Sequence, residues 1–403
     1  MTWDASRRVF LRGAGLAAVG VGLAPSSLLV RTARAAAGDR VLVEVFLRGA
    51  ADGLNLCAPY GDSDYYDLRQ GIALPRPGSS DGVVNLDGYF GMHPELAPLK
   101  PFFDDGRLAF VHAVGNPQVT RSHFDAQDFM ESGTPGDKRT ATGWLDRAIA
   151  RLPGSGVTQA VSFSSQLTRS FLGPEPVLVA QTLSAFDLRA RNWRGEAETL
   201  LRAMYDADST PVGSNGRETF EAMNALLRAP APPAANGAQY PTGTVGNGLR
   251  QAAQLVKAGI GTRCIFVNVT GGFDTHSNQL TNNRNDYRPL GQGLAAFATD
   301  LGGLLDDVAL MVTTEFGRTA AVNGAAGTDH GTGYCMMVLG GRVRGGRVLG
   351  RWPGLGRTQL YENRDLAATT DFRDVFQEVA RAQFGIAEAL FPGYTPGPGV
   401  GVV

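Results

Sequence analysis

Four of the five histidines in this chain lie within two residues of a carboxylate. The pairs are His93 with Glu95, His123 with Asp125, His276 with Asp274, and His330 with Asp329. The segments that carry them have the character of buried strand ends or of the turns that follow such strands. Imidazole and carboxylate groups are good ligands for divalent cations. Their gathering at strand ends therefore predicts a metal-dependent enzyme.

Two turns that follow apolar runs carry an aspartate as candidate metal ligand. In Asp274-Thr275-His276, an extended backbone points the carboxylate and the imidazole to the same side, so both are candidates. Asp52 follows the first apolar run of the chain and is a candidate by its position at a strand end. The alternatives are a helix cap for Asp274 and an ordinary turn aspartate for Asp52.

A second group of candidate ligands lies between the last two apolar runs. Glu315 ends a strongly apolar run, where a bare carboxylate is costly unless it is paired or bound to a metal. Asp329 and His330 follow in a loop rich in glycine, alanine and asparagine. Alone, this dipeptide could be a solvated turn. Together with Glu315 it predicts a metal site.

Ser122 begins an apparent helix and is the candidate nucleophile. A hydroxyl at a helix start lies in a positive field, which favours an anionic substrate and stabilises a developing alkoxide. The alternative is an ordinary serine N-cap. Arg121 and Arg318 are candidate binders of a tetrahedral oxyanion, because a guanidinium presents a planar fork of donors.

The other two histidines and two of the three cysteines are predicted to be structural. His93 and His112 are each expected to be hydrogen-bonded within the fold. The three cysteines are an odd number without a CxxC pair, which argues against a disulfide scaffold. Cys264 and Cys335 lie in apolar runs and are expected in the core.

Strand-like and helix-like segments alternate along the chain. Strands are predicted over 41–47, 108–114, 264–269, 308–312 and 334–339, and helices over 94–104, 122–132, 246–258, 289–305 and 371–384. Near-continuous apolar strands indicate a sheet that is covered on both faces. The alternation predicts an α/β fold with a largely parallel sheet and with ligands bound outside the carboxyl ends of the strands. The candidate site residues fall at those ends.

The N-terminal segment is typical of a twin-arginine export signal. Arg7 and Arg8 precede a weakly apolar run over 13–30, and residues 33–35 have the small-x-small pattern of a cleavage site. We expect residues 1–35 to be removed after passage through the twin-arginine export machinery. The mature protein would then be periplasmic or secreted. The run is too weakly apolar for a stable membrane span.

Charge and length limit the remaining possibilities. The formal net charge is −1 without long charged runs, so neither nucleic acid nor an anionic membrane surface is an expected partner. Residues 36–403 suit one domain. Within it, residues 229–245 form a connector rich in proline, glycine and alanine. Residues 150–228 are expected to be an insertion or cap over the site, so that insertion and connector together span 150–245.

Several segments, taken in order, resemble a known exported family. They are RGAADGLN (48–55), RSHFDAQDFMESG (121–133), GGFDTH (271–276), TEFGRT (314–319) and GTDHG (327–331). With the export signal they resemble the bacterial family known as domain of unknown function 1501, related to the alkaline phosphatase and sulfatase superfamily. The resemblance implies an alkaline-phosphatase-like fold with two divalent metals at the carboxyl ends of the sheet. By position it implies Asp52 as the early ligand, Ser122 as nucleophile, Asp274 and His276 as the first ligand pair, and Glu315, Asp329 and His330 as the later group.

Two functions follow as hypotheses. The first is an exported hydrolase of small-molecule or envelope phosphate or sulfate esters, in which two cations about 4 Å apart clamp the reacting oxygens. The second is a catalytically silent exported metal-binding protein that binds a ligand or an envelope partner. Phosphomutase chemistry fits export poorly, because sugar and nucleotide phosphates are mainly cytoplasmic. The ligand set permits Zn²⁺, Mn²⁺, Mg²⁺ or Ca²⁺, and no organic cofactor is expected.

Overall fold

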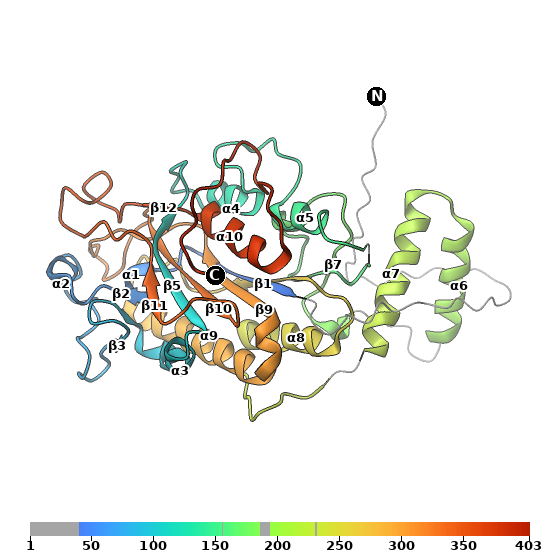
Figure 1. Cartoon of the computed structure of the whole chain (residues 1–403), viewed down its shortest axis with the longest axis horizontal. Helices are drawn as coiled ribbons and strands as arrows, with labels where there is room; N and C mark the ends of the chain where they lie inside the picture. The colour runs from blue at the N-terminus through green and yellow to red at the C-terminus, as the bar shows by residue number, and fades with distance from the viewer. Residues whose placement is uncertain (1–39, 155, 186–193, 230–231) are drawn as a thin grey trace.

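A nine-stranded sheet runs through the molecule, with helices on both of its faces (Figure 1). The computed structural model describes residues 40–154, 156–185, 194–229 and 232–403, so the predicted signal peptide over 1–35 lies outside the described residues. The strands lie in the order β11 (Arg347–Leu349), β5 (Leu108–Gly115), β10 (Tyr334–Gly340), β9 (Val308–Thr314), β1 (Val41–Arg48), β8 (Cys264–Thr270), β6 (Ala160–Phe163) and β7 (Leu178–Val179). A further strand, β12 (Thr370–Asp371), pairs with β5. The predicted α/β class is confirmed.

One strand runs against the others. β10 pairs antiparallel with β5 and β9, whereas the other pairs described within this sheet are parallel. The carboxyl ends of β1, β5, β8 and β9 therefore lie at the same edge as the start of β10. Segments that leave the first four strands, and the segment that enters β10, must meet at that edge.

Alternate side chains of β1 serve the two faces of the sheet. Val43 and Val45 belong to one buried apolar cluster, and Leu42 and Phe46 belong to the other. The first cluster includes residues of α8 (Thr244–Ala258) and α9 (Gln279–Leu301), and the second includes residues of α4 (His123–Ser132), α5 (Trp144–Ile149) and α10 (Phe372–Phe384). All four β1 side chains are 0% exposed. Burying each one contributes about 1.5–3 kcal/mol of hydrophobic stabilisation.

The smaller elements are α1 (Gly53–Leu56), β2 (Cys57–Ala58), α2 (Ser63–Leu68), β3 (Val84–Asn85), β4 (Gly91–Met92), η1 (Pro94–Leu99), α3 (Lys100–Asp104), η2 (Arg169–Phe171), η3 (Leu183–Ala185) and η5 (Gly302–Asp307). Most of them lie between β1 and β5 in the sequence, whereas η2 and η3 flank β7 and η5 follows α9. β2, β4 and β3 form a separate three-stranded sheet.

Two predicted helices differ from the structure because of proline. The segment predicted as one helix over 94–104 is a 3₁₀ helix, η1, followed by the short α3. Pro98 and Pro101 lie in it and lack the N–H that a regular α-helix needs. The helix predicted over 289–305 is α9, which begins at Gln279 and keeps Pro289 inside. A proline inside a helical pattern usually marks a helix start or stop, which is why the earlier turns of α9 were missed.

Residues 150–228, the predicted insertion or cap, contribute two strands to the sheet and a pair of neighbouring helices. β6 and β7 extend the sheet beyond β8. They have four and two residues, too few to show a strand period in the sequence. The helices that follow, α6 (Arg194–Ala207) and α7 (Pro211–Arg228), lie at the end of the molecule opposite to α2 and β3 (Figure 1). In the described part of residues 150–228, the chain thus adds two strands to the edge of the sheet and two helices beyond them.

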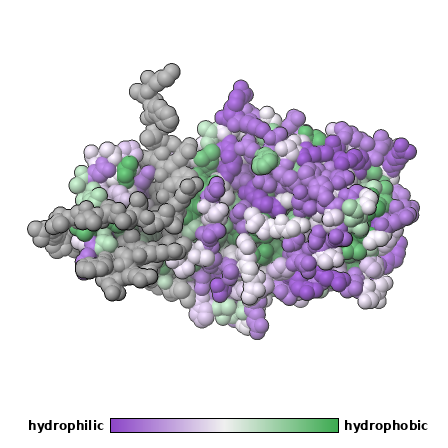
Figure 2. All heavy atoms as spheres, turned by 180° about the vertical axis from the view of Figure 1, so that it is seen from behind, coloured by the Kyte–Doolittle hydropathy of each residue, from purple (hydrophilic) through white to green (hydrophobic). Residues whose placement is uncertain are grey.

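Within the described ranges, no helix is both long enough and apolar enough to cross a bilayer. Seen from the side opposite to Figure 1, the coloured surface is mostly hydrophilic, and apolar residues appear in small separate spots (Figure 2).

Glu44 is a carboxyl group inside the core and gives the fold a pH dependence. It lies on β1, is 1% exposed, and accepts a hydrogen bond from Trp144 Nε1 at 3.1 Å. Burial, with the nearby Glu131, raises the pKa of Glu44 to about 8 from an ordinary 4.5. The folded state holds the proton of Glu44 more tightly than the unfolded state does. The resulting contribution to the free energy of unfolding is complete below pH 4.5 and is lost as the pH rises towards 8.

Replacing Glu44 with glutamine is expected to raise the free energy of unfolding by about 4 kcal/mol at pH 8. At pH 5 the effect should be small, because glutamine then replaces a carboxyl group that is already neutral. Urea unfolding at the two pH values measures the difference. Asp104→Asn is the control, because this exposed aspartate should give no pH-dependent gain. A Glu44→Gln variant that is equally destabilised at both pH values would contradict the prediction.

Candidate metal centre

Four chain segments meet at the edge of the sheet where β1, β5, β8 and β9 end. His123 is the first residue of α4, which follows β5. Asp274 and His276 follow β8, and Glu315 follows β9. His330 precedes β10, whose reversed direction brings this loop to the same edge. The strand directions thus place all five side chains in one region.

Two glycines let these segments approach closely. Gly49 has a φ of +118°, and a Cβ atom on it would lie 3.0 Å from the backbone nitrogen of Asp274. A Cβ atom on Gly327 would lie 2.2 Å from the carbonyl carbon of His276. A side chain at either position would push the β1 turn or the 327–331 loop away from the β8 turn.

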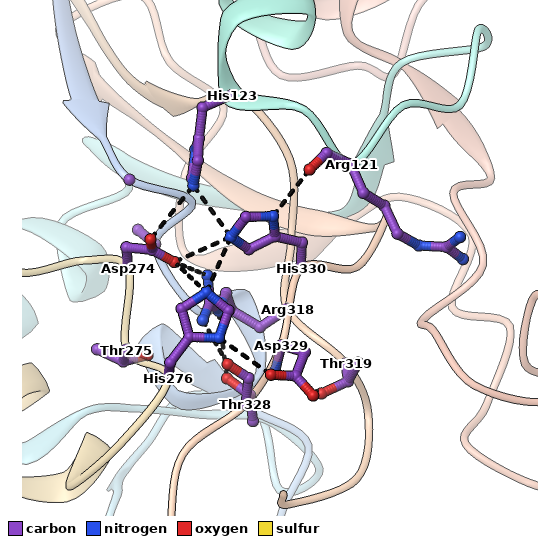
Figure 3. A network of polar contacts seen from close by, with 12 residues as sticks. Arg121, His123, Asp274, Thr275, His276, Arg318, Thr319, Thr328, Asp329 and His330 are labelled. Atoms are coloured by element: carbon purple, nitrogen blue, oxygen red, sulfur yellow. Dashed lines mark hydrogen bonds and ion pairs between the residues drawn. The ribbon is translucent and has the colours of Figure 1, made fainter.

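Three imidazoles and one carboxylate point at one another (Figure 3). His330 Nε2 lies 3.1 Å from His123 Nε2 and 3.0 Å from His276 Nε2. Asp274 Oδ1 lies 3.1 Å from His330 Nε2 and 3.0 Å from His276 Nε2, and Asp274 Oδ2 lies 3.5 Å from His123 Nε2. We call His123, Asp274, His276 and His330 the four-residue cluster.

Each imidazole of the four-residue cluster has an oxygen acceptor at its other ring nitrogen. The Nδ1 acceptors are Glu315 Oε1 at 2.8 Å for His123, Asp329 Oδ1 at 3.0 Å for His276, and the backbone oxygen of Arg121 at 2.8 Å for His330. A neutral imidazole that donates from Nδ1 carries its lone pair on Nε2. The three lone pairs then face one another and repel unless a proton or a cation lies between them.

The donor set fits a divalent cation. Ligand atoms of His123, His330 and Asp274 all lie within 4.8 Å of one another, and two imidazole nitrogens with one carboxylate oxygen suit Zn²⁺. His276 Nε2 lies 3.0 Å from two of these three groups, His330 and Asp274. Carboxylate or carbonyl acceptors on the far side of ligating histidines fix the tautomer and the ring orientation, and all three histidines have one. Mg²⁺ and Ca²⁺ prefer oxygen ligands, so the nitrogen-rich set disfavours them.

Buried charges reinforce this arrangement. Burial raises the pKa of Glu315, but hydrogen bonds from His123 and from Gln127 Nε2 at 2.8 Å outweigh it and hold that pKa below its ordinary value. The hydrogen bond to Glu315 in turn raises the pKa of His123, whereas burial lowers the pKa of His330. A fixed anion thus lies behind one imidazole of the four-residue cluster.

The four-residue cluster opens to solvent on one side. The side chains of Asp274 and His276 are 43% and 46% exposed, whereas those of His123 and His330 are 24% exposed. Phe316 packs against both less exposed rings, with centroid distances of 4.9 Å to His123 and 5.1 Å to His330. A small ligand could therefore reach the cluster from the side of Asp274 and His276.

The structure gives different places to the sequence-predicted ligands, and five of the six lie in or directly behind the four-residue cluster. Asp274, His276 and His330 point into the four-residue cluster. Glu315 and Asp329 hold two of its imidazoles through Nδ1. Sequence alone could not separate these two roles, because a carboxylate suits both.

Asp52 is not brought into the four-residue cluster. It is 1% exposed, and its carboxylate is paired with the buried guanidinium of Arg69. It also accepts hydrogen bonds from the Gln279 side chain and from the Leu54 N–H. These partners account for its burial without a metal, and as the N-cap of α1 it matches the turn role that was the alternative.

Ser122 is the N-cap of α4. Its Oγ accepts a hydrogen bond from the Asp125 N–H at 3.4 Å, which is long for such a bond. The backbone places it between Arg121, whose carbonyl holds His330, and His123 of the four-residue cluster.

The two arginines expected to bind an oxyanion are engaged with carboxylates. Arg121 is paired with Asp365 at 2.6 Å and Glu362 at 2.7 Å, and its guanidinium points away from the four-residue cluster (Figure 3). Arg318 is fully buried and lies 2.5 Å from Asp274 Oδ1. Burial raises the pKa of Asp274, but Arg318 outweighs it and lowers that pKa. Arg318 thus keeps a cluster carboxylate ionised.

His123 is the cluster member that was not predicted as a ligand. It lies next to Ser122, the candidate nucleophile, and two residues before Asp125. The useful signal was its place just after a predicted strand of the same sheet.

A second group of potential ligands lies in the core. Cys57, His112 and Cys335 are buried and close together. His112 Nε2 lies 2.9 Å from the carbonyl oxygen of Cys57, and its Nδ1 accepts from the Ala113 N–H at 2.9 Å. Both nitrogens are used, so His112 has the hydrogen-bonded structural role expected for it.

Fold and site together define an α/β protein with a preformed, histidine-rich candidate metal centre. Residues 112–390, more than half of the chain, match the model of a family described as Protein of unknown function (DUF1501). The chain belongs to this family, which confirms the resemblance seen in its segments.

Other comparisons add little. No curated protein matches the chain. Among solved structures, the C-terminal periplasmic domain of EcEptC from Escherichia coli, in complex with Zn, shares 11% identity at a TM-score of 0.33, over 76% of this chain and 74% of that chain. At this distance we transfer neither its residues nor its ligand to this chain.

Proposed function

We propose that this chain is an exported metal-dependent hydrolase of phosphate or sulfate esters. The convergence of three Nε2 lone pairs with the Asp274 carboxylate, on the solvent side of the carboxyl edge of the sheet, is the observation that carries the proposal. His123, Asp274, His276 and His330 would hold the cation. A divalent cation held there would supply Lewis-acid polarisation of an ester oxygen. We propose one cation at this place instead of two, because Asp52 and Glu315 are engaged elsewhere.

The protein groups around the cluster would orient the cation and the substrate. Glu315, Asp329 and the Arg121 carbonyl fix the three imidazoles, and Arg318 keeps Asp274 ionised. Ser122 remains the proposed nucleophile, because its hydroxyl lies at the start of a helix of ten residues beside His123. Export is proposed from the twin-arginine segment, which lies outside the described residues.

Ser122→Ala is expected to lower turnover of aryl phosphates or sulfates by at least about 100-fold. Metal content should stay unchanged, and stability should fall by only about 1 kcal/mol, the usual cost of losing a helix cap. The assay is steady-state hydrolysis by protein loaded with Zn²⁺ or Mn²⁺. Thr210→Ala is the matched control, because Thr210 caps α7 in the same way and α7 lies at the other end of the molecule. Full turnover by Ser122→Ala would sink the nucleophile assignment.

The second candidate function is a catalytically silent metal-binding protein. Its support is the pairing of Arg121 and Arg318 with carboxylates, which removes both expected oxyanion binders. A panel of aryl phosphates and sulfates separates the two functions. Bound metal without turnover on the whole panel would favour the silent protein, and absence of bound metal would reject both.

A further inference from the structure

Phe124 is an exposed aromatic residue and the neighbour in sequence of His123, a member of the candidate metal centre. It is 87% exposed and follows His123 in the first turn of α4. The other large hydrophobic side chains that are exposed in the described part of the chain are Met204, Val212, Leu280, Leu304 and Tyr361, at 54%, 65%, 38%, 45% and 38%. Phe124 has a larger exposed fraction than any of these side chains.

The packing of α4 does not require this ring. The helix buries Ala126, Phe129 and Met130, which complete its apolar face. On its exposed side Asp125 is paired with Lys138. Phe124 therefore stands on a polar surface and contributes little to the core, which leaves the ring free to contact a ligand.

Its position favours a small ligand of the four-residue cluster. Successive helix residues differ in direction by about 100°, so Phe124 stands to one side of the inward-pointing His123. Two further exposed apolar residues border the same segments. Leu280 follows Gln279, whose side chain contacts Thr275 at 3.0 Å. Tyr361 precedes Glu362, the partner of Arg121.

Phe124 suits an aromatic group better than a protein partner. A stable protein interface needs about 800 Å² on each side, whereas one ring on a polar helix surface offers far less. A planar group of similar size can stack on the ring face. The side chains of Met204 and Val212 are also exposed, but they lie on α6 and α7, away from the site.

We propose that Phe124 is a substrate-contacting residue, and that the ester taken by the four-residue cluster carries an aromatic group that stacks on this ring. This inference rests on the proposed function, because it assigns the substrate class of the same site. The tetrahedral oxyanion of such an aryl ester would face the cluster, and its aryl group would lie over Phe124.

The test compares phenylphosphonate with methylphosphonate, which differ only in the aromatic group and are not hydrolysed. Calorimetric titration of the full chain loaded with Zn²⁺ should show phenylphosphonate binding about threefold to tenfold more tightly, as expected for one aromatic stacking contact. Phe124→Ala should remove this preference and leave methylphosphonate binding unchanged, and Phe124→Trp should keep it. Met204→Ala and Val212→Ala are the matched controls and should behave as the unmodified chain. If aryl phosphate is turned over, Phe124→Ala should raise KM and leave kcat nearly unchanged.

Three results would overturn the inference. Equal binding of both phosphonates to the unmodified chain would reject Phe124 as a specificity residue and leave the proposed function standing. Failure of both phosphonates to bind the Zn²⁺-loaded chain would reject the inference and the proposed function together. A dimer that becomes monomeric on Phe124→Ala, measured by sedimentation at several concentrations, would assign the ring to contact between two copies of the chain.

Discussion

Replacing His330 with alanine is expected to weaken Zn²⁺ binding by more than about 100-fold. Its Nε2 lies 3.0 to 3.1 Å from an atom of each other member of the four-residue cluster, so its loss opens the centre of the site. Altering a partner behind a ligand already costs about 10–100-fold, and removal of the ligand itself should cost more. Competition with a chromogenic chelator gives the affinity. The rise in melting temperature that Zn²⁺ gives the unmodified chain should disappear.

Other variants make this result specific. His123→Ala should weaken binding to a similar degree, because its Nε2 belongs to the same cluster. Asp329→Asn should cost about 10–100-fold, because it changes only the acceptor behind His276. Asp137→Asn, at an exposed aspartate paired with Arg139, should cost nothing. Unmodified metal content in His330→Ala and His123→Ala would show that the metal lies elsewhere.

The edge of the sheet where the site lies could be predicted from sequence because the strands are simple. Long apolar runs such as those of β1 and β9 form buried parallel strands, and ligands collect at their carboxyl ends. The segments after β8 and β9 were placed at the site for this reason. The short β6 was not predicted, because a strand of four residues shows no clear alternation of apolar and polar side chains.

The role of each polar side chain at that edge depends on contacts that the sequence does not carry. Glu315 and Asp274 are both carboxylates after strands, yet Glu315 accepts a hydrogen bond from Nδ1 of His123 whereas Asp274 faces Nε2 of three histidines. Which ring nitrogen faces inward is decided by the acceptor behind it. One of those acceptors is the backbone carbonyl of Arg121, which no motif could indicate.

Replacing Asp52 distinguishes a metal ligand from a structural carboxylate in the turn after β1. Asp52→Ala is expected to destabilise the fold by about 3–5 kcal/mol, because it leaves the buried guanidinium of Arg69 without its carboxylate. Zn²⁺ bound per folded molecule should stay the same. Urea unfolding gives the stability, and metal analysis of folded protein gives the content. Asp104→Ala is the control, because its pairing with Lys100 is exposed and should contribute less than about 1 kcal/mol.

A double replacement tests whether the ion pair explains this loss. Arg69→Met alone should also be strongly destabilising, because it leaves Asp52 as an unpaired buried charge. Combined with Asp52→Asn, it should cost clearly less than the sum of the two single changes, because neither charge is then left alone. Additive costs would mean that the two side chains act separately. If Asp52→Ala instead removed Zn²⁺ while the fold kept its stability, Asp52 would be a ligand, and the cation would have to lie between α1 and the four-residue cluster.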